Sequence, residues 1–230
     1  MKKEVLILSL GGSLIIPNKI NFNYLKKFKE ILLKNTNKYK FVVVCGGGSI
    51  AREYITALKQ IGKDERFQSL IGISSTRTNA RFMSYFFGLN PIKGIPHTMY
   101  EIQHYLKEQD IVFCGALEYQ PHQTSDSTSA EIAQELKARF INLTNVPKGL
   151  HDKNPLEHKD AKFIPKISWK EFEKMANKIK FKPGLHFVLD SSASKIILRN
   201  KIPTYIIGDN VKELENFLKN KKFIGTTISG

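Results

Sequence analysis

The sequence predicts an α/β fold in which helices cover both faces of a mostly parallel sheet. Short apolar runs rich in β-branched residues alternate with longer segments whose apolar residues recur at helical spacing. Two of the expected strands run directly into glycines, at positions 11–12 and 46–48. In a parallel sheet such turns follow the carboxyl ends of the strands, where ligands bind. We therefore expect a ligand site at that edge of the sheet.

Length and composition are those of one folded unit. The chain has 230 residues, of which 41% are hydrophobic, enough for a single domain over 1–230. No apolar run approaches the roughly 20 residues of a membrane span, so no membrane partner is expected. Residues 5–10 are too short for a signal segment and are interpreted as the first strand of a cytoplasmic protein. Cys45 and Cys114 are expected to be buried thiols.

The net charge of +15 raises nucleic acid as a possible partner. The lysines, however, are dispersed along the predicted helices rather than clustered with aromatic residues. A positive field would equally steer phosphorylated small molecules toward the protein. We therefore do not expect nucleic acid to be the partner.

The first half of the chain supplies three expected strands and four expected helices. The strands are residues 5–10, 41–44 and 111–114. The helices are residues 22–33, 49–61, 65–87 (one helix or two) and 98–107. Residues 115–126 are polar and irregular, and a helix is expected from about 127, capped by Asp126 or Ser125.

The second half continues the alternation. Strands are expected at 140–143, 187–189, 204–207 and 223–228. Helices are expected at 168–180, from 190, and at 211–218. Ser168 and Glu171 have the spacing of a capping box, and Asp190 stands where an N-cap would.

Residues 41–52 read as a buried strand, three glycines and the start of a helix. Glycine lets backbone N–H groups approach an anion closely, and the first helical turn points unpaired N–H groups at it. Arg52, one turn into the helix, would add a planar cationic fork. The alternative is an ordinary strand-to-helix turn. The segment has neither the Gly-Lys-Ser/Thr of a Walker loop nor the spacing of a dinucleotide fingerprint.

A series of segments carries a family resemblance that extends over nearly the whole chain. They are Gly-Gly-Ser at 11–13, Gly-Gly-Gly-Ser-Ile-Ala-Arg at 46–52, Ile-Gly-Ile and Thr-Arg-Thr-Asn-Ala at 71–80, Thr-Asn-Val through Asp-Lys-Asn-Pro at 144–155, Asp-Ser-Ser-Ala at 190–193 and Gly-Thr-Thr-Ile at 225–228. In this order they resemble the amino acid kinase superfamily and, within it, the archaeal-type uridylate (UMP) kinases.

The resemblance implies an open three-layer αβα sandwich, with an acceptor-binding N-terminal part and an ATP-binding part from about residue 140. It implies Mg²⁺-dependent transfer of the ATP γ-phosphate to UMP, giving UDP in pyrimidine nucleotide biosynthesis, and a homo-oligomer. The implied ATP contacts are Gly11, Gly12, Ser13, Gly48, Arg52, Thr144, Asn145, His151 and Asn154. The implied UMP contacts are Gly47, Ser69, Thr124 and Ser125. Arg52 and Asp190 are the expected catalytic residues, although Asp190 could equally be only a helix cap.

The chain also departs from the family pattern. Ser9 stands where many members carry a lysine, so another cation, Arg52 or Lys195, must neutralise developing charge. Ser69 replaces an acidic residue that grips the ribose hydroxyls, and Pro121-His122 replaces a Pro-Gly turn in the loop 116–125, which we expect to carry the base preference. The histidines are not spaced as metal ligands. Another acceptor, or a nucleotide sensor without turnover, therefore remains an alternative.

Overall fold

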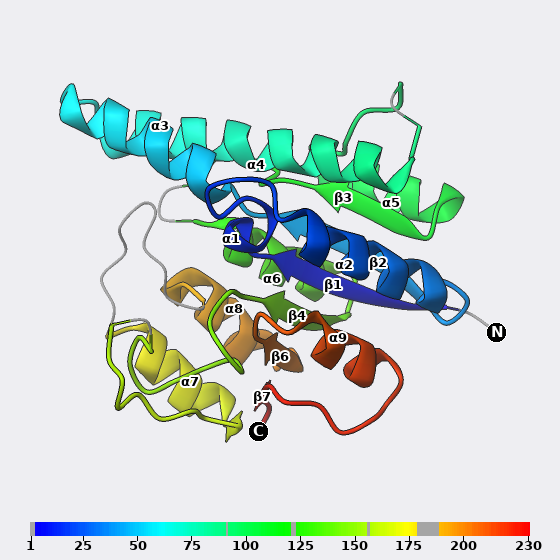
Figure 1. Cartoon of the computed structure of the whole chain (residues 1–230), viewed down its shortest axis with the longest axis vertical. Coiled ribbons are helices and arrows are strands. Elements are labelled where there is room, and N and C mark those ends of the chain that lie inside the picture. Colours follow the sequence, from blue (N-terminus) through cyan, green and yellow to red (C-terminus); the bar gives the residue numbers. More distant parts are fainter. Residues whose placement is uncertain (1–2, 91, 121–122, 156, 179–188) are drawn as a thin grey trace.

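A computed structural model describes residues 3–90, 92–120, 123–155, 157–178 and 189–230. In this part of the chain seven strands and nine helices follow one another (Figure 1). The strands are β1 (Glu4–Leu10), β2 (Tyr39–Cys45), β3 (Ile111–Cys114), β4 (Arg139–Leu143), β5 (Lys166–Ile167), β6 (Thr204–Ile207) and β7 (Thr226–Ile228). The helices are α1 (Gly12–Ile15), α2 (Phe22–Asn35), α3 (Gly48–Gln60), α4 (Glu65–Phe87), α5 (Met99–Glu108), α6 (Ser125–Glu135), α7 (Trp169–Ala176), α8 (Ser191–Asn200) and α9 (Val211–Leu218).

The strands form one sheet in the order β3-β2-β1-β4-β6-β7-β5. Neighbouring strands are parallel except for β6 and β7. In this register Leu10 lies beside Cys45 of β2 on one side and beside Leu143 of β4 on the other. Three central strands therefore end at one level, and the segments that follow them meet at the same edge.

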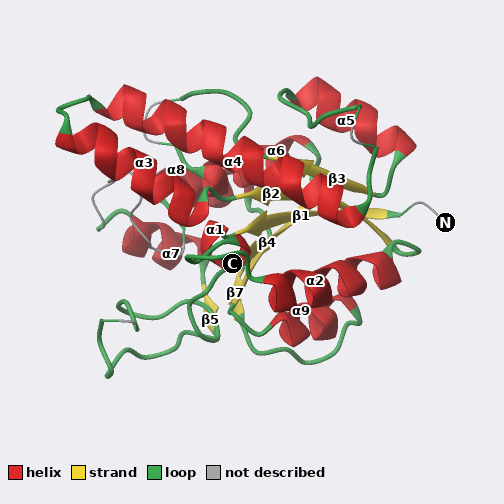
Figure 2. Ribbon diagram, turned by 45° about the horizontal axis from the view of Figure 1, so that its top comes forward, coloured by secondary structure: helices red, strands yellow, loops and turns green. Residues whose placement is uncertain are grey.

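Helices cover both faces, which confirms the predicted three-layer sandwich. Alternate residues of β1 enter two cores: Leu6 and Leu8 pack with α2, α4 and α9, whereas Ile7 packs with α5, α6, α7 and α8. Both views show α3 lying along α4 (Figures 1 and 2), and Figure 2 shows α2 beside α9. Strands with β-branched residues suit this sheet because both of its faces are buried, as in parallel sheets generally.

Several expected boundaries are confirmed, including 111–114, 204–207 and 211–218. Residues 65–87 form one helix, with Asp64 as its N-cap and Gly88 ending it in the left-handed conformation. The last strand is shorter than expected, because the ring of Phe223 packs against Tyr205 and Phe217 at centroid distances of 6.2 and 5.3 Å instead of lying in the ladder. The short elements α1 and β5 were not predicted.

Two helix boundaries also differ from the prediction. Helix α6 begins at Ser125, and its N-cap is Thr124, whose hydroxyl accepts from the Asp126 N–H at 3.1 Å. The expectation that Asp126 or Ser125 caps this helix is therefore wrong. Helix α7 opens with the predicted capping box but ends at Ala176. Residues 177–178 form a turn and Leu189 is not in a strand, so the expected helix to 180 and strand to 189 are wrong at these positions. The rest of these two predictions, at 179–180 and 187–188, lies outside the described residues.

Cys45 and Cys114 are both buried, as predicted, and both are free thiols. They belong to different cores, Cys45 to the one that contains α2 and Cys114 to the one that contains α5. Within the described residues, the helices are too short or too polar to cross a bilayer.

Candidate functional site

Two glycine turns touch each other at the carboxyl edge of the sheet. A Cβ added to Gly12 would lie 2.0 Å from the backbone nitrogen of Gly48, and one added to Gly46 would lie 2.4 Å from that of Gly12. Gly48 also has a φ of +67°, which side chains rarely adopt. Helices α1 and α3 begin at these turns, and the first N–H groups of a helix have no partner within it. The turns therefore bring backbone donors from two segments to one place.

Helix α4 fixes this edge of the sheet through hydrogen bonds to the segments that follow β2 and β3. Asn79 Nδ2 donates to the carbonyl of Gly46 at 2.7 Å and is buried. One turn earlier, Thr76 Oγ1 accepts from the Ala116 N–H at 3.0 Å, and Arg77 Nε donates to the Ala116 carbonyl at 3.1 Å. These contacts fix the glycine turn after β2 and the start of the loop after β3 to one rigid helix.

Arg52 lies one turn into α3 and lines the cavity at this edge. Its guanidinium donates to Ser13 Oγ at 3.2 Å and to the Pro17 carbonyl at 3.0 Å. The arginine therefore joins the start of α3 to the first glycine turn. A phosphate bound at the two turns would lie beside a cationic fork that is already positioned there.

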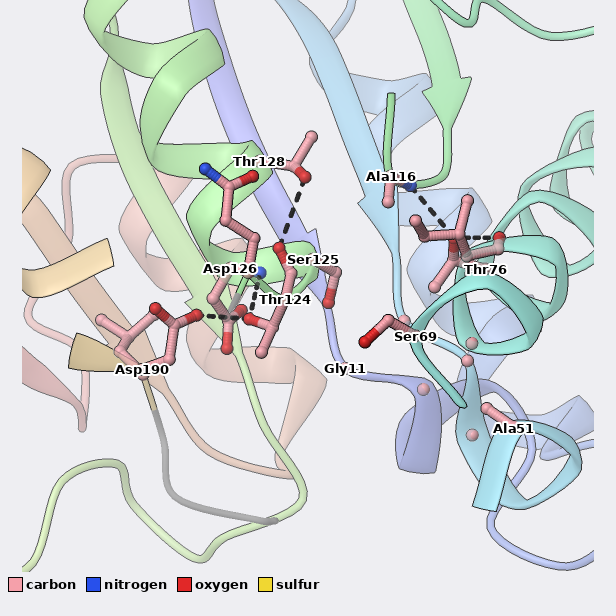
Figure 3. A pocket seen from close by; sticks show the side chains of 18 of the residues that line it. Gly11, Ala51, Ser69, Thr76, Ala116, Thr124, Ser125, Asp126, Thr128 and Asp190 are labelled. Atoms are coloured by element: carbon pink, nitrogen blue, oxygen red, sulfur yellow. Dashed lines mark hydrogen bonds between the residues drawn. The ribbon is translucent and has the colours of Figure 1, made fainter. Parts of the chain in front are cut away.

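A pair of carboxylates lies on the wall contributed by α6 and α8. Asp126 Oδ1 accepts from Ser9 Oγ at 2.6 Å and from Asn142 Nδ2 at 2.8 Å. Asp190 caps α8 by accepting from the Ala193 N–H at 2.8 Å, and it also accepts from the hydroxyls of Ser127 and Thr124. Figure 3 shows Asp126 and Asp190 on one side, facing Ser69 and Thr76 across the site.

The environment of Asp126 shifts its acidity. Burial, together with the nearby charge of Asp190, raises the pKa of this carboxyl to about 7. The hydrogen bonds from Ser9 and Asn142 act in the opposite direction. All the hydrogen-bond donors to the two carboxylates in the described chain are neutral hydroxyl, amide or backbone groups.

These features surround one cavity of about 260 Å³. Most of the predicted site residues line it: Gly11, Gly12, Ser13, Gly47, Gly48, Arg52, Ser69, Thr124, Ser125, Thr144, Asn145 and Asp190. Among the described residues that line it, Arg52 is the only basic one, and Lys195 is exposed on α8 outside this lining.

Two predicted ATP contacts are not brought into this cavity. His151 is 7% exposed, with Nδ1 3.1 Å from the Gly149 carbonyl and its ring 5.7 Å from that of Phe163. Asn154 donates from Nδ2 to Glu157 Oε1 at 2.9 Å. Both belong to the long loop between β4 and β5. Pro121 and His122, singled out in the sequence, lie outside the described residues.

Sequence reasoning missed the roles of Asp126 and Asn142. Asp126 was interpreted as a helix cap, and Asn142 was counted only as part of a strand. The available signal was polarity inside apolar strands: Ser9 and Asn142 are the polar residues in the buried stretches of β1 and β4, and they are register partners. A polar residue at such a buried position indicates a functional role, because burying a polar side chain requires a hydrogen-bond partner.

The fold and the site define a class of α/β protein that binds phosphorylated ligands at the carboxyl edge of its sheet. Residues 4–208 match the sequence profile of the amino acid kinase family. The chain belongs to this family.

Relatives of known function have similar lengths and share about a third of the sequence. A uridylate kinase of Thermoplasma volcanium is 32% identical over 228 residues, which cover 98% of this chain and 97% of that protein. A uridylate kinase of Methanocaldococcus jannaschii is 32% identical over 231 residues, with coverages of 98% and 99%. The crystal structure of uridylate kinase from Archaeoglobus fulgidus superposes with a TM-score of 0.80 at 30% identity, covering 97% of this chain and 99% of that one.

Proposed function

We propose that this protein is a nucleoside monophosphate kinase that transfers the γ-phosphate of ATP to UMP, giving UDP and ADP. One observation carries the proposal: the touching glycine turns lie in a single cavity that also contains most of the predicted ATP residues and all the predicted UMP residues. The similarity to uridylate kinases over nearly the whole chain supports UMP as the acceptor.

In this proposal the two ends of the cavity have different tasks. Thr144 and Asn145 follow β4, and with the turn at Gly12 they hold ATP. Ser69 on α4, with Thr124 and Ser125 at the start of α6, receives UMP. Placing both substrates in one cavity replaces a bimolecular encounter by a positioned pair, which is the main requirement of phosphoryl transfer.

Charge neutralisation is the second requirement. The backbone N–H groups of Gly12 and Gly48 are proposed to receive the transferring oxygens, and Arg52, which lines the same cavity, would add a guanidinium there. The donor set on the opposite wall is carboxylate and amide oxygen, from Asp126, Asp190 and Asn142, which suits Mg²⁺. Bound there, Mg²⁺ would supply the positive charge that a lysine at position 9 would otherwise provide.

His151 and Asn154 remain proposed contacts for the adenosine end of ATP. His151 would have to expose its ring, which now packs on Phe163. Their side chains are therefore proposed to contribute less to ATP binding than those that line the cavity.

We also propose a cytoplasmic homo-oligomer. Exposed apolar residues lie on α3 (Tyr54), at its C-cap (Ile61) and on α4 (Phe67 and Leu70). Exposed apolar surface on two helices that pack together favours self-association. Light scattering coupled to gel filtration measures the mass, and a monomer at micromolar concentration would contradict this proposal.

The test of the activity is direct. Purified protein is incubated with Mg-ATP and, separately, UMP, dUMP, CMP, AMP and small carboxylic acids, and ADP and the product are separated by chromatography. We expect UDP from UMP as the dominant product. ADP formed only with a carboxylic acid would assign another acceptor within the family. ATP binding in a thermal-shift assay without any turnover would favour a nucleotide sensor.

A further inference from the structure

Two glutamine side chains meet in the loop between β3 and α6. Gln123 Nε2 donates to Gln120 Oε1 at 2.9 Å, and the same nitrogen donates to Glu131 Oε1 on α6 at 2.7 Å. Both glutamines line the cavity, whereas Glu131 is not among the lining residues. Gln123 directly precedes Thr124, a proposed UMP contact. The glutamine pair therefore belongs to the end of the cavity that is proposed to receive UMP.

Glu131 determines which way the Gln123 amide faces. The two ends of an amide have similar shapes, and a half-turn about the last side-chain bond exchanges its carbonyl and its NH₂ group. An ionised carboxylate only accepts hydrogen bonds, so the NH₂ group of Gln123 must face Glu131. The opposite orientation would place two acceptors against each other and lose the hydrogen bond. The carboxylate therefore selects one of the two orientations.

The selected orientation extends from Gln123 to Gln120. Because Gln123 offers its NH₂ group, Gln120 must offer its carbonyl oxygen, and the NH₂ group of Gln120 is then turned away from the contact. Within the described residues, neither Gln123 Oε1 nor Gln120 Nε2 has a hydrogen-bond partner. The pair thus leaves one acceptor and one donor open, and Glu131 fixes which residue carries which.

This arrangement addresses the chemical difference between uracil and cytosine. Uracil has an N3–H donor beside a carbonyl acceptor, whereas cytosine has an N3 acceptor beside an amino donor. A freely turning glutamine amide can satisfy either base, because its half-turn exchanges donor and acceptor. An amide held in one orientation satisfies only one of the two bases and leaves polar atoms unpaired against the other.

The start of the same loop is also held in place. Thr76 Oγ1 accepts from the Ala116 N–H at 3.0 Å (Figure 3), and Arg77 Nε donates to the Ala116 carbonyl at 3.1 Å. Thr76 and Arg77 belong to α4, which also carries Ser69, another proposed UMP contact. The loop is therefore tied to α4 at its start and, through Glu131, to α6 near its end. Both anchors fix the glutamine pair relative to the proposed nucleotide site.

We propose that Glu131 is a positioning residue for base recognition, which holds the amides of Gln123 and Gln120 in the orientation that accepts uracil and rejects cytosine. The proposal rests on the proposed UMP kinase function and deepens it. It assigns the choice between two pyrimidines to a carboxylate that does not line the cavity and acts only through Gln123.

The test compares UMP and CMP as acceptors of phosphate from Mg-ATP. Glu131→Gln keeps the size of the side chain but can present either a carbonyl or an NH₂ group to Gln123, so the orientation is no longer selected. We expect the ratio of kcat/KM for UMP over CMP to fall by about tenfold. The fall should come mainly from a gain with CMP, with the KM for ATP unchanged. A purely structural role would instead lower the activity with both acceptors.

The matched control is Glu135→Gln, the same substitution one turn later on α6, at an exposed residue outside the cavity lining. Its ratio should equal that of the wild type. A second variant, Gln123→Met, removes the amide and keeps the length of the side chain. It should also lower the ratio, and adding Glu131→Gln to it should cause no further change, because Glu131 acts through Gln123.

Circular dichroism shows that each variant is folded. An unchanged ratio in Glu131→Gln, an equal loss with both acceptors, or additive effects in the double variant would overturn the positioning role, while UMP turnover by the wild type would keep the proposed function. Should the wild type turn over neither nucleotide, the proposed function fails. The same ratio is then taken from calorimetric affinities for UMP and CMP, and an unchanged ratio or no binding of UMP would overturn the positioning role as well.

Discussion

The two walls of the cavity are built from different parts of the polypeptide. The glycine turns at Gly12 and Gly48 present backbone N–H groups, and their shape depends on the absence of side chains. The opposite wall presents the side chains of Asp126, Asp190 and Asn142, brought from α6, the start of α8 and β4. One wall is a donor surface for anions and the other an acceptor surface. The contrast matters because transfer of a phosphoryl group between two anions needs both a phosphate cradle and a means of cancelling charge.

The donor wall is expected to be the less tolerant of substitution. Gly12→Ala would place a Cβ 2.0 Å from the Gly48 nitrogen, where only backbone can move away. We expect a loss of stability of about 3 kcal/mol or more, and a fall in kcat/KM of at least about a hundredfold. Chemical denaturation and steady-state kinetics measure the two effects.

The matched control is Gly62→Ala, at a positive φ of 74° with no atom within 4 Å of the added Cβ. It should lose only about 1–2 kcal/mol of stability and keep its activity. Similar losses in the two variants would show that the contact between the turns is not what constrains Gly12.

Arg52 supplies the side-chain charge of the donor wall. Arg52→Ala should remove a charge-assisted contact of about 1.5–3 kcal/mol, which is about tenfold or more in kcat/KM. Arg52→Lys should recover only part of it, because a point charge does not replace a planar fork. Nucleotide affinity and initial rates give the measurement.

Because Arg52 also donates to Ser13 Oγ, Ser13→Ala serves as the comparison that removes this contact and keeps the charge. It should have a smaller effect than Arg52→Ala. Should Arg52→Ala turn over UMP at the wild-type rate, the arginine would have a purely structural role in joining α1 and α3.

Asp190 on the acceptor wall has two separable roles. Asp190→Ala removes both the N-cap of α8 and the charge, whereas Asp190→Asn keeps a good cap and removes only the charge. We expect the alanine variant to be less stable than the asparagine variant by about 1 kcal/mol, while both lose activity. Thermal unfolding and kcat/KM are compared in the same preparations. A fully active Asp190→Asn variant would reduce this residue to a helix cap.

The smallest predicted effect concerns acceptor choice. Ser69 lines the cavity and is a proposed UMP contact. A carboxylate at this position could accept from both ribose hydroxyls, whereas a single hydroxyl cannot. We expect UMP to be preferred, with weak discrimination against dUMP. Ser69→Asp should raise the ratio of kcat/KM for UMP over dUMP by about tenfold, the low end for a hydrogen bond to a charged group, without changing ATP affinity. An unchanged ratio would place ribose recognition elsewhere.

Much of the donor wall could be predicted because its chemistry is local. Strand, glycines and helix start follow one another within residues 41–52, and backbone conformation at glycine depends mainly on immediate neighbours. The alternation of strand-like and helix-like apolar runs was sufficient to predict the α/β class. Several strands and helices have the expected bounds. The cap of α6 was assigned to the wrong residue because Asp126 turns toward Ser9 and Asn142, partners that lie far from it in sequence.

The sequence by itself determined the sandwich, the two glycine turns and the position of Arg52, since these depend on periodicity and local backbone geometry. Only the tertiary structure decided that Gly12 touches Gly48, that Ser9 and Asn142 share one carboxylate, and that His151 packs on Phe163. Each of these pairings depends on strand order and register, which join segments distant in the chain. Because burying an unpaired polar group costs free energy, the sequence indicates that such a group needs a hydrogen-bond partner. Only the fold decides which residue that partner is.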